Sequence, residues 1–269
     1  DLYKREVDAS TLATSAYGTS TLGGGIKFGY PLSERVSVSF GALAESVEVT
    51  LFDNSSAIYR SFVEAFGNKY RYGAFTVGWA RDTRDSLIVT TDGLLTRFST
   101  EFAQGDLQYY RLGVNQQFYW PLSRNLTLFF NTDLGYASGS GGKQLPFFKN
   151  YYAGGPGTVR GYEDFSLGPV DGDGNTLGGT RRVVGNVELL FPMPGAAQDK
   201  SLRLGLFVDA GQVYAAGAPV ELSELRYSAG LALAWASPLG PLRISYASPL
   251  NEREGDRVQR LQLKIGTAF

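Results

Sequence analysis

Hydrophobic and polar residues alternate with a period of two along most of the chain. Four segments show this most clearly: 110–120, 125–136, 202–209 and 226–235. In 202–209, the even positions hold Leu, Leu, Leu and Val, while the odd positions hold Arg, Gly, Phe and Asp. Alternation over eight or more residues predicts β-strands with one apolar and one polar face. These runs exceed the usual length of soluble strands and match the length that crosses a bilayer.

The same pattern extends to twelve strands. Short, proline-marked turns at 31–34, 121–124 and 237–241 alternate with longer connections, and 83–92 and 192–200 are somewhat longer members of the short set. Short turns on one rim and long loops on the other are typical of outer-membrane β-barrels, and an even strand count puts both termini on the periplasmic side. The predicted strands are 2–12, 17–31, 34–50, 68–82, 93–104, 107–121, 124–137, 180–191, 201–214, 225–237, 241–248 and 257–269. The long connections are 51–67, 138–179, 215–224 and 249–256.

The polar faces of these strands favour a barrel over a soluble sandwich. A sandwich exposes a face rich in Lys, Glu and Thr, whereas here that face carries Gly, Ser, Asn and scattered charges, as a crowded wet lumen requires. Aromatic residues at Tyr30, Trp120, Phe191 and Trp235 stand beside turns, as in an interfacial girdle, although aromatic residues also favour strands in general. We predict an all-β fold: a single antiparallel transmembrane β-barrel over residues 1–269.

Composition excludes several classes of function. The chain has no cysteine and no histidine, which excludes disulfide frameworks, iron–sulfur sites, almost all zinc enzymes and every His-dependent hydrolase mechanism. Its net charge of −1 provides no basic field for nucleic acid. No run of about 18 apolar residues is present, so no transmembrane helix is expected, and the first residues lack the apolar core of a signal peptide.

One segment resembles a metal-binding loop at first sight. Asp171-Gly172-Asp173 begins like a calcium loop, but Thr176 stands where the required Gly belongs and Arg182 stands where the bidentate Glu belongs. A flexible loop is the better interpretation. We therefore expect no catalytic residues, no metal and no cofactor.

The connection 138–179 is too long to serve only as a link between strands, since loops of such length are usually functional or disordered. Its middle, residues 147–162, is rich in aromatic and apolar side chains around one arginine. Such a composition needs a surface to pack on. We expect the loop to find that surface inside the barrel lumen.

Several motifs now indicate a family. Gly154-Gly155 followed by Val159-Arg160-Gly161-Tyr162 resembles the sixth-loop signature of the Omp85 superfamily. The match continues through most of the chain, in the order 146–155, 167–169, 188–194, 207–211, 227–230, 235–242 and the C-terminal Phe269. The resemblance is strongest to the outer-membrane protein assembly factors of this superfamily, in a form close to that of β-proteobacteria.

The resemblance carries functional implications. It implies a barrel of the machinery that folds and inserts β-barrel proteins in the outer membrane of Gram-negative bacteria. The implied partners are outer-membrane lipids and unfolded outer-membrane protein clients, with accessory lipoproteins and POTRA domains in the full-length protein. In one respect the chain departs from the family, whose members carry periplasmic POTRA domains before a sixteen-stranded barrel. The resemblance implies that this chain begins at the equivalent of the fifth strand, so we expect the POTRA domains and four strands to be absent from it.

The resemblance also implies that Arg160 turns into the lumen and pairs with carboxylates of the barrel wall, at the matching positions Glu188 and Asp209. Strand parity agrees independently, because Asp209 shares the polar face with Arg203, and Glu188 lies opposite the apolar residues of its strand. A buried guanidinium needs such partners. Without the resemblance, an ordinary solvated loop arginine is an equally good interpretation.

Its neighbours in the motif have expected places as well. Val159 and Tyr162 are expected to pack on the lumen side. Gly161 is expected where the chain reverses against the wall, because a Cβ would clash there or because φ is positive.

The last predicted strand has its own implication. Leu263 and Ile265 lie on its apolar face, followed by Gly266 and a terminal Phe269. A terminal aromatic residue on an alternating strand resembles the β-signal by which barrel proteins are themselves recognised. A last strand with free backbone groups can be captured by edge pairing, and Phe269 can equally anchor the chain at the membrane interface.

Two classes of function remain open at this point. The first is a non-enzymatic barrel of the insertion machinery, acting through a strand seam and local disturbance of the membrane. The second is a transporter, either a two-partner secretion pore, which shares the Arg-Gly-Tyr/Phe loop, or a passive outer-membrane pore. A passive pore needs an open lumen, so the loop 138–179 would have to fold outward.

Overall fold

A computed structural model describes residues 2–8, 16–195, 201–237 and 240–266. Within these residues, twelve strands form one antiparallel sheet in which consecutive strands are neighbours. In sheet order they are β1 (Leu2–Asp8), β2 (Tyr17–Ser33), β3 (Val36–Leu51), β4 (Lys69–Asp82), β5 (Gly93–Gly105), β6 (Tyr109–Ser123), β7 (Leu126–Gly139), β9 (Arg181–Pro192), β10 (Leu202–Tyr214), β11 (Arg226–Ser237), β12 (Gly240–Pro249) and β14 (Leu261–Ile265). A separate two-stranded ladder joins β8 (Gly161–Tyr162) to β13 (Val258–Gln259).

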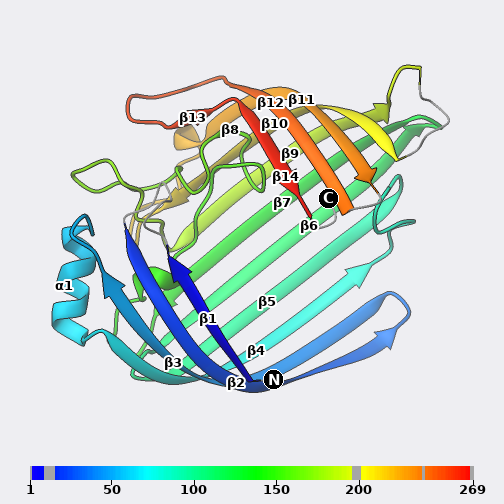
Figure 1. The fold of residues 1–269 in the computed structure, drawn as a ribbon. Helices are drawn as coiled ribbons and strands as arrows, with labels where there is room; N and C mark the ends of the chain where they lie inside the picture. Colours follow the sequence, from blue (N-terminus) through cyan, green and yellow to red (C-terminus); the bar gives the residue numbers. More distant parts are fainter. Residues whose placement is uncertain (1, 9–15, 196–200, 238–239, 267–269) are drawn as a thin grey trace.

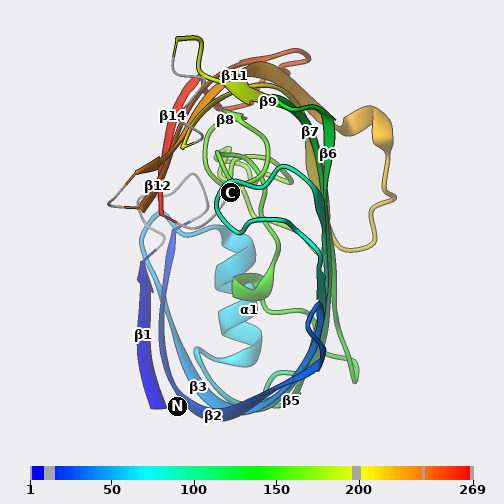
Figure 2. The ribbon, with the colours of Figure 1, turned by 90° about the vertical axis from the view of Figure 1, so that its right-hand side faces the viewer.

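The sheet curls into a barrel-shaped wall around a central space (Figure 2). Long connections gather at one end of the wall and short turns at the other (Figure 1). The twelve-stranded antiparallel architecture predicted from the sequence is therefore confirmed, with most strand ends within a few residues of their predicted positions.

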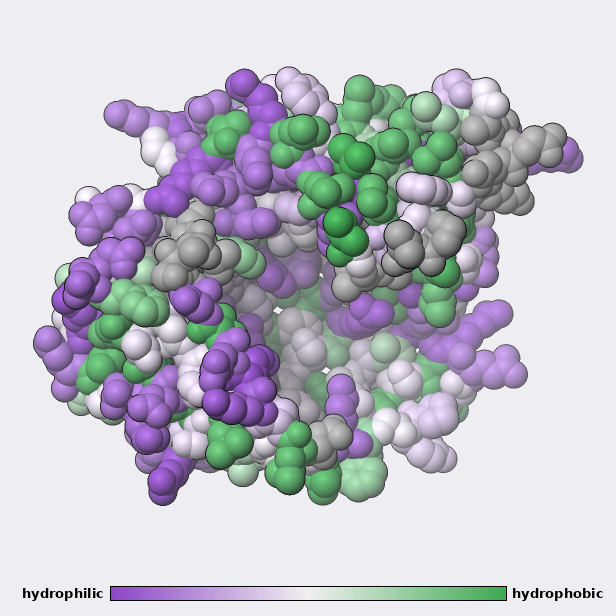
Figure 3. Space-filling model, viewed as in Figure 1, coloured by the Kyte–Doolittle hydropathy of each residue, from purple (hydrophilic) through white to green (hydrophobic). Residues whose placement is uncertain are grey.

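Strand alternation sets which side chains face the lumen. On β10, Leu206 and Val208 are each 47% exposed on the outer face, whereas Phe207 and Asp209 between them are buried on the inner face. The same parity holds on β14, where Leu261, Leu263 and Ile265 point outward. Figure 3 shows the resulting apolar patch over β12 and β14. The apolar outer face and polar inner face predicted by alternation are thus present.

The predicted strands at the two ends of the chain have different outcomes. The first predicted strand, 2–12, is described as β1 only to Asp8, and residues 9–12 lie outside the described residues. The last predicted strand, 257–269, is divided into β13 and β14. Arg260 separates the two, and β13 leaves the wall to pair with β8 inside it. The long-range pairing with β8 gives these backbone groups their partners, which the alternation of a single strand does not reveal.

The connection predicted as a loop over 51–67 contains the helix α1 (Ala57–Phe66). The Ser56 side chain caps it by accepting a hydrogen bond from the backbone N–H of Ile58. Tyr59 and Phe62 are buried on its inner face. Among the residues that the structure describes, no helix is both long and apolar enough to cross a membrane.

The helix belongs to a core inside the wall at the long-loop end (Figure 2). There the Tyr59 and Phe147 rings stack with centroids 4.0 Å apart, which joins α1 to the start of the long loop. Tyr17, Tyr70 and other side chains of the first half of the sheet complete this cluster. Packing against the wall, and not the local sequence alone, thus stabilises the ten-residue helix.

The two end strands of the sheet are β1 and β14. Within the described ranges no ladder joins them. Among the described residues, each of the two is paired on one side only, β1 with β2 and β14 with β12. These edges define a seam in the wall.

Candidate functional site

The long loop 138–179 lies inside the wall (Figure 2). Isolated bridges between Tyr151 and Gly179, and between Ala153 and Leu167, fold it onto itself. Val159 and Tyr162 are fully buried, in a cluster with Val184 of β9 and Val213 of β10. The loop therefore packs on the inner faces of these two strands.

Arg160 projects from this loop into a pair of wall carboxylates. Its Nε and Nη2 donate to the two carboxylate oxygens of Asp209 at 2.7 and 2.8 Å, and its backbone N–H donates to Asp209 Oδ2 at 3.0 Å. Its Nη1 donates to Glu188 Oε2 at 2.9 Å. All three side chains are buried. The structure thus brings together the three charged residues singled out from the sequence, in a bidentate geometry that only arginine provides.

The residues around the Arg160 guanidinium accommodate its flat face and its carboxylate partners. Its Cζ lies 3.3 Å from the centroid of the Phe207 ring, so its face is stacked while its edge is hydrogen-bonded. Gly205 leaves room for Glu188, because a Cβ at Gly205 would stand 2.0 Å from Glu188 Oε1. Burial alone would lower the pKa of the Arg160 guanidinium, but the hydrogen bonds and charges of Asp209 and Glu188 outweigh burial and raise that pKa.

A second arginine completes the cluster. Arg243 of β12 donates from Nη2 to Glu188 Oε1, and its side chain is mostly buried. Two cations therefore meet two carboxylates, and the cluster is neutral overall. Sequence reasoning missed Arg243. The available signal was its place in the alternation: Arg243 precedes the outward-facing Ile244 and so must face the lumen. From the sequence alone, however, one arginine in a lumen looks the same as any solvated charge on a strand.

The rest of the motif joins the loop to the last strand. The backbone N–H of Gly161 donates to Gln262 Oε1 at 3.2 Å, and Gln262 Nε2 donates to the Tyr162 carbonyl at 2.6 Å. Gly161 has φ +90°, and a Cβ there would lie 3.1 Å from Ala247 Cβ on β12. Gln262 was not singled out from the sequence, because its partners lie about a hundred residues away along the chain.

Of the residues predicted as a C-terminal signal, three are described by the structure and one is not. Leu263 and Ile265 are exposed on the outer face at 56% and 70%, and Gly266 has φ +77° with its N–H bound to the Pro241 carbonyl at 2.9 Å. Phe269 lies outside the described residues. The described part of the segment is therefore an apolar edge that ends in a turn against β12.

The loop has a second charged anchor on the opposite half of the sheet. Lys149 Nζ donates to Glu101 Oε1 of β5 at 3.1 Å and lies 4.0 Å from Glu45 Oε2 of β3. It also stands over the rings of Tyr72 and Tyr109, at 5.4 and 5.3 Å from their centroids. Sequence reasoning did not single out this lysine. With Arg160 on the β9–β10 side, it fixes the loop to both halves of the wall.

Over the described ranges, no group of three or more Asp, Glu, His or Cys side chains could hold a metal ion. The carboxylates of the cluster are already bound by arginines. The arrangement is therefore suited to hold a loop in place by compensated charge.

Comparisons with known proteins place this geometry in a family. The family model described as the Omp85 superfamily domain matches residues 1–269. The chain belongs to the Omp85 superfamily. The outer membrane protein assembly factor BamA of Neisseria meningitidis is 38% identical over the whole chain, which spans 39% of that relative. A SAM50-like protein of Schizosaccharomyces pombe is 30% identical over 71% of the chain and 43% of its own length.

A solved structure of another Omp85-like barrel gives the same arrangement. BamA from Haemophilus ducreyi lacking POTRA domains 1–3 superposes with a TM-score of 0.89 at 26% identity, covering 97% of this chain and 57% of that one. The chain thus spans about two fifths of the Neisseria relative and somewhat more than half of the crystallised Haemophilus chain.

Proposed function

We propose that this chain is the barrel of a machinery that folds β-barrel proteins and inserts them into the bacterial outer membrane. The observation that carries the proposal is the position of the Val159–Tyr162 motif. Arg160 fixes it to β9 and β10, while Gly161 and Tyr162 fix it to Gln262 of β14, the strand at the seam. The loop thereby supports the strand whose outer edge is open.

The chemistry of the seam supports a non-enzymatic mechanism. An edge strand presents backbone N–H and C=O groups that an incoming strand can pair with. In lipid, each unpaired backbone group costs several kcal/mol, so a client strand gains by pairing there before its own sheet is complete. The exposed Leu261, Leu263 and Ile265 keep the outer face of this edge in contact with lipid tails. No covalent step is involved.

The partners in this proposal follow from the superfamily. Unfolded outer-membrane proteins are the clients, and the lipids of the outer membrane surround the barrel. POTRA domains and accessory lipoproteins in the full-length protein would deliver clients to the barrel. The name of one relative supports this assignment, since the Neisseria protein is called an outer membrane protein assembly factor.

The alternative of a passive pore is less well supported, because the loop 138–179 is packed inside the wall on two charged anchors. A conductance measurement distinguishes the two functions. In planar bilayers we expect this chain to give no steady large pore. A constant high conductance at low voltage would favour the passive pore.

A folding assay tests the proposal directly. The chain is reconstituted into liposomes, an unfolded outer-membrane β-barrel protein is added, and its folding is followed by the gel shift between heated and unheated samples. We expect faster client folding than in empty liposomes, and a smaller acceleration with Arg160→Ala. Equal client folding rates in loaded and empty liposomes would refute the function.

A further inference from the structure

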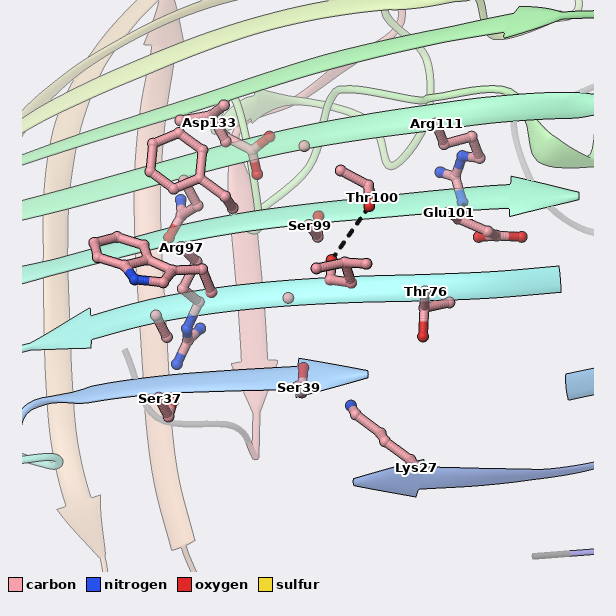
Figure 4. Close-up of a pocket in the computed structure, with 18 of the residues that line it drawn as sticks. Lys27, Ser37, Ser39, Thr76, Arg97, Ser99, Thr100, Glu101, Arg111 and Asp133 are labelled. Carbon is pink, nitrogen blue, oxygen red and sulfur yellow. Dashed lines mark hydrogen bonds and ion pairs between the residues drawn. The ribbon is translucent and has the colours of Figure 1, made fainter. Parts of the chain in front are cut away.

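The lumen keeps an open cavity of about 610 Å³ beside the long loop. It lies against the inner faces of β2 to β7 and β9, and Tyr151 of the loop closes one side. Figure 4 shows Arg97 on one side of this space, Arg111 and Lys27 on the other, and Ser39 and Ser99 between them. We call it the cationic lumen cavity.

Positive charge dominates its lining, although the whole chain has a net charge of −1. The charged lining residues are Lys27, Arg97, Arg111, Arg182, Glu101 and Asp133. Four cations thus face two carboxylates. The Asp133 carboxylate is taken by Arg182, which donates to it from Nε at 3.1 Å and from Nη2 at 2.5 Å.

The remaining carboxylate cannot neutralise the other three cations. Glu101 Oε1 accepts hydrogen bonds from Tyr109 and Lys149, and Arg111 reaches Glu101 Oε2 only at 3.7 Å. Among the described residues, the side chains of Lys27 and Arg97 make no hydrogen bond or ion pair. Asp82 is close enough to interact electrostatically with Arg97, but its two carboxylate oxygens already accept hydrogen bonds from Arg84 at 3.0 and 2.8 Å. The cavity therefore presents uncompensated positive charge.

Between these cations the inner face of the wall carries small residues, and several of them bear hydroxyl groups. Ser39 and Ser99 lean over glycines of the next strand, since a Cβ at Gly78 or Gly113 would stand 2.5 or 2.6 Å from their Oγ atoms. Hydroxyl groups can donate to any oxyanion. Bulky side chains are absent from this row, so a ligand can lie along the wall without a side-chain barrier at these positions.

The spacing of the cations indicates the size of the ligand. Lys27 and Arg111 lie in one lateral row of the sheet, joined through paired residues on β3, β4 and β5. Four steps of about 4.8 Å between strands place their Cα atoms roughly 19 Å apart along the curved wall. A single small ion could contact both only if the two long side chains converged on it. An extended peptide, which advances about 3.3 Å per residue, bridges them with about six residues.

We propose that the cationic lumen cavity binds an acidic stretch of an unfolded polypeptide in extended form. Lys27 and Arg97 would bind its carboxylates, while Ser39 and Ser99 donate hydrogen bonds between them. This inference rests on the proposed function, because a machinery that handles unfolded chains supplies such segments. It assigns the cavity the role of a transient holding site for negatively charged client segments.

The test measures binding of a fluorescent hexaglutamate peptide to the folded chain in uncharged detergent micelles, by fluorescence anisotropy at low salt. We expect Lys27→Gln and Arg97→Gln each to weaken binding about three- to tenfold and to act nearly additively. The matched control is Arg124→Gln, which removes one positive charge from an exposed turn outside the lumen and is expected to leave affinity unchanged. Added NaCl is expected to weaken binding, and hexaglutamine is expected not to bind.

Three outcomes would overturn the inference: no binding of hexaglutamate, equal binding to wild type and to the Lys27→Gln/Arg97→Gln double variant, or displacement by inorganic phosphate far better than by chloride at equal ionic strength. The last result would indicate a site for a single ion. The gel shift on heating verifies that each variant is folded. Client folding in liposomes is measured separately, so that acceleration without peptide binding refutes this inference alone, and peptide binding without acceleration refutes the proposed function alone.

Discussion

Arg160 and Arg243 hold the same carboxylate, that of Glu188, through its two different oxygens. Arg160 reaches Oε2 from the long loop at 2.9 Å, and Arg243 reaches Oε1 from β12. Glu188 itself lies on β9, so one buried side chain connects three separate parts of the chain. Because Asp209 binds Arg160 as well, the cluster carries equal positive and negative charge. Removing any one of its members leaves an unbalanced buried charge.

The first prediction concerns Arg160→Ala. The variant leaves Glu188 and Asp209 buried with only Arg243 as counter-charge, and we expect the free energy of unfolding to fall by about 3–5 kcal/mol. Thermal loss of the gel shift in detergent measures this. Arg124→Ala, at an exposed turn, serves as the control and is expected to melt with the wild type. Identical melting of Arg160→Ala and wild type would contradict a stabilising role for the ion pairs.

The second prediction concerns coupling between Arg243 and Glu188. Arg243→Met is expected to destabilise the folded chain less than Arg160→Ala, because Arg160 still hydrogen-bonds both carboxylates, whereas Arg243 contacts only Glu188. In the Glu188→Gln background, Arg243→Met is expected to cost a different amount, with a coupling energy of roughly 0.5–3 kcal/mol. Melting of the two single variants and the double variant provides this value. Strict additivity would show that the contact contributes nothing to stability.

The strand pattern was predictable because it depends on a local, repeated signal. Each strand of the wall must alternate between lipid and lumen, so residues such as Leu206 and Asp209 have their faces determined by parity alone. The position of Arg160 beside Glu188 and Asp209 needed the family resemblance in addition, since parity places the carboxylates in the lumen without saying what meets them.

The contacts that escaped prediction depend on distant parts of the chain. Gln262 meets the motif only because β13 leaves the wall to pair with β8. Lys149 finds Glu101 because α1 and Phe147 pack together and fix the start of the loop. The helix itself spans only ten residues and draws its stability from Tyr59 and Phe62 packing against the wall. A period along the sequence contains none of this information.

The third prediction compares two glycines of the same loop. Gly161→Ala forces a Cβ into a backbone with φ +90° and against Ala247, so we expect a loss of about 1–2 kcal/mol in stability. Gly157→Ala is the matched control, because a Cβ there meets no atom within 4 Å. Melting of both variants tests the difference. A Gly161→Ala protein as stable as Gly157→Ala would show that the reversal of the chain at this residue tolerates a side chain.

The last prediction concerns the anchor at Lys149. Lys149→Met keeps the length of the side chain but removes the ion pair with Glu101 and the charge near Glu45, while Tyr72 and Tyr109 retain an apolar contact. Because the site is partly exposed, we expect the start of the loop to open more readily by about 1–2 kcal/mol, which corresponds to roughly 5- to 30-fold faster cleavage by chymotrypsin at the Phe and Tyr residues of 147–152. Lys143→Met is the comparator, since Lys143 binds only the carbonyls of Gly105 and Asp106 at an exposed position. Its effect on cleavage is expected to be clearly smaller. Equal cleavage of wild type and Lys149→Met would show that Arg160 and the aromatic core hold the loop without the second anchor.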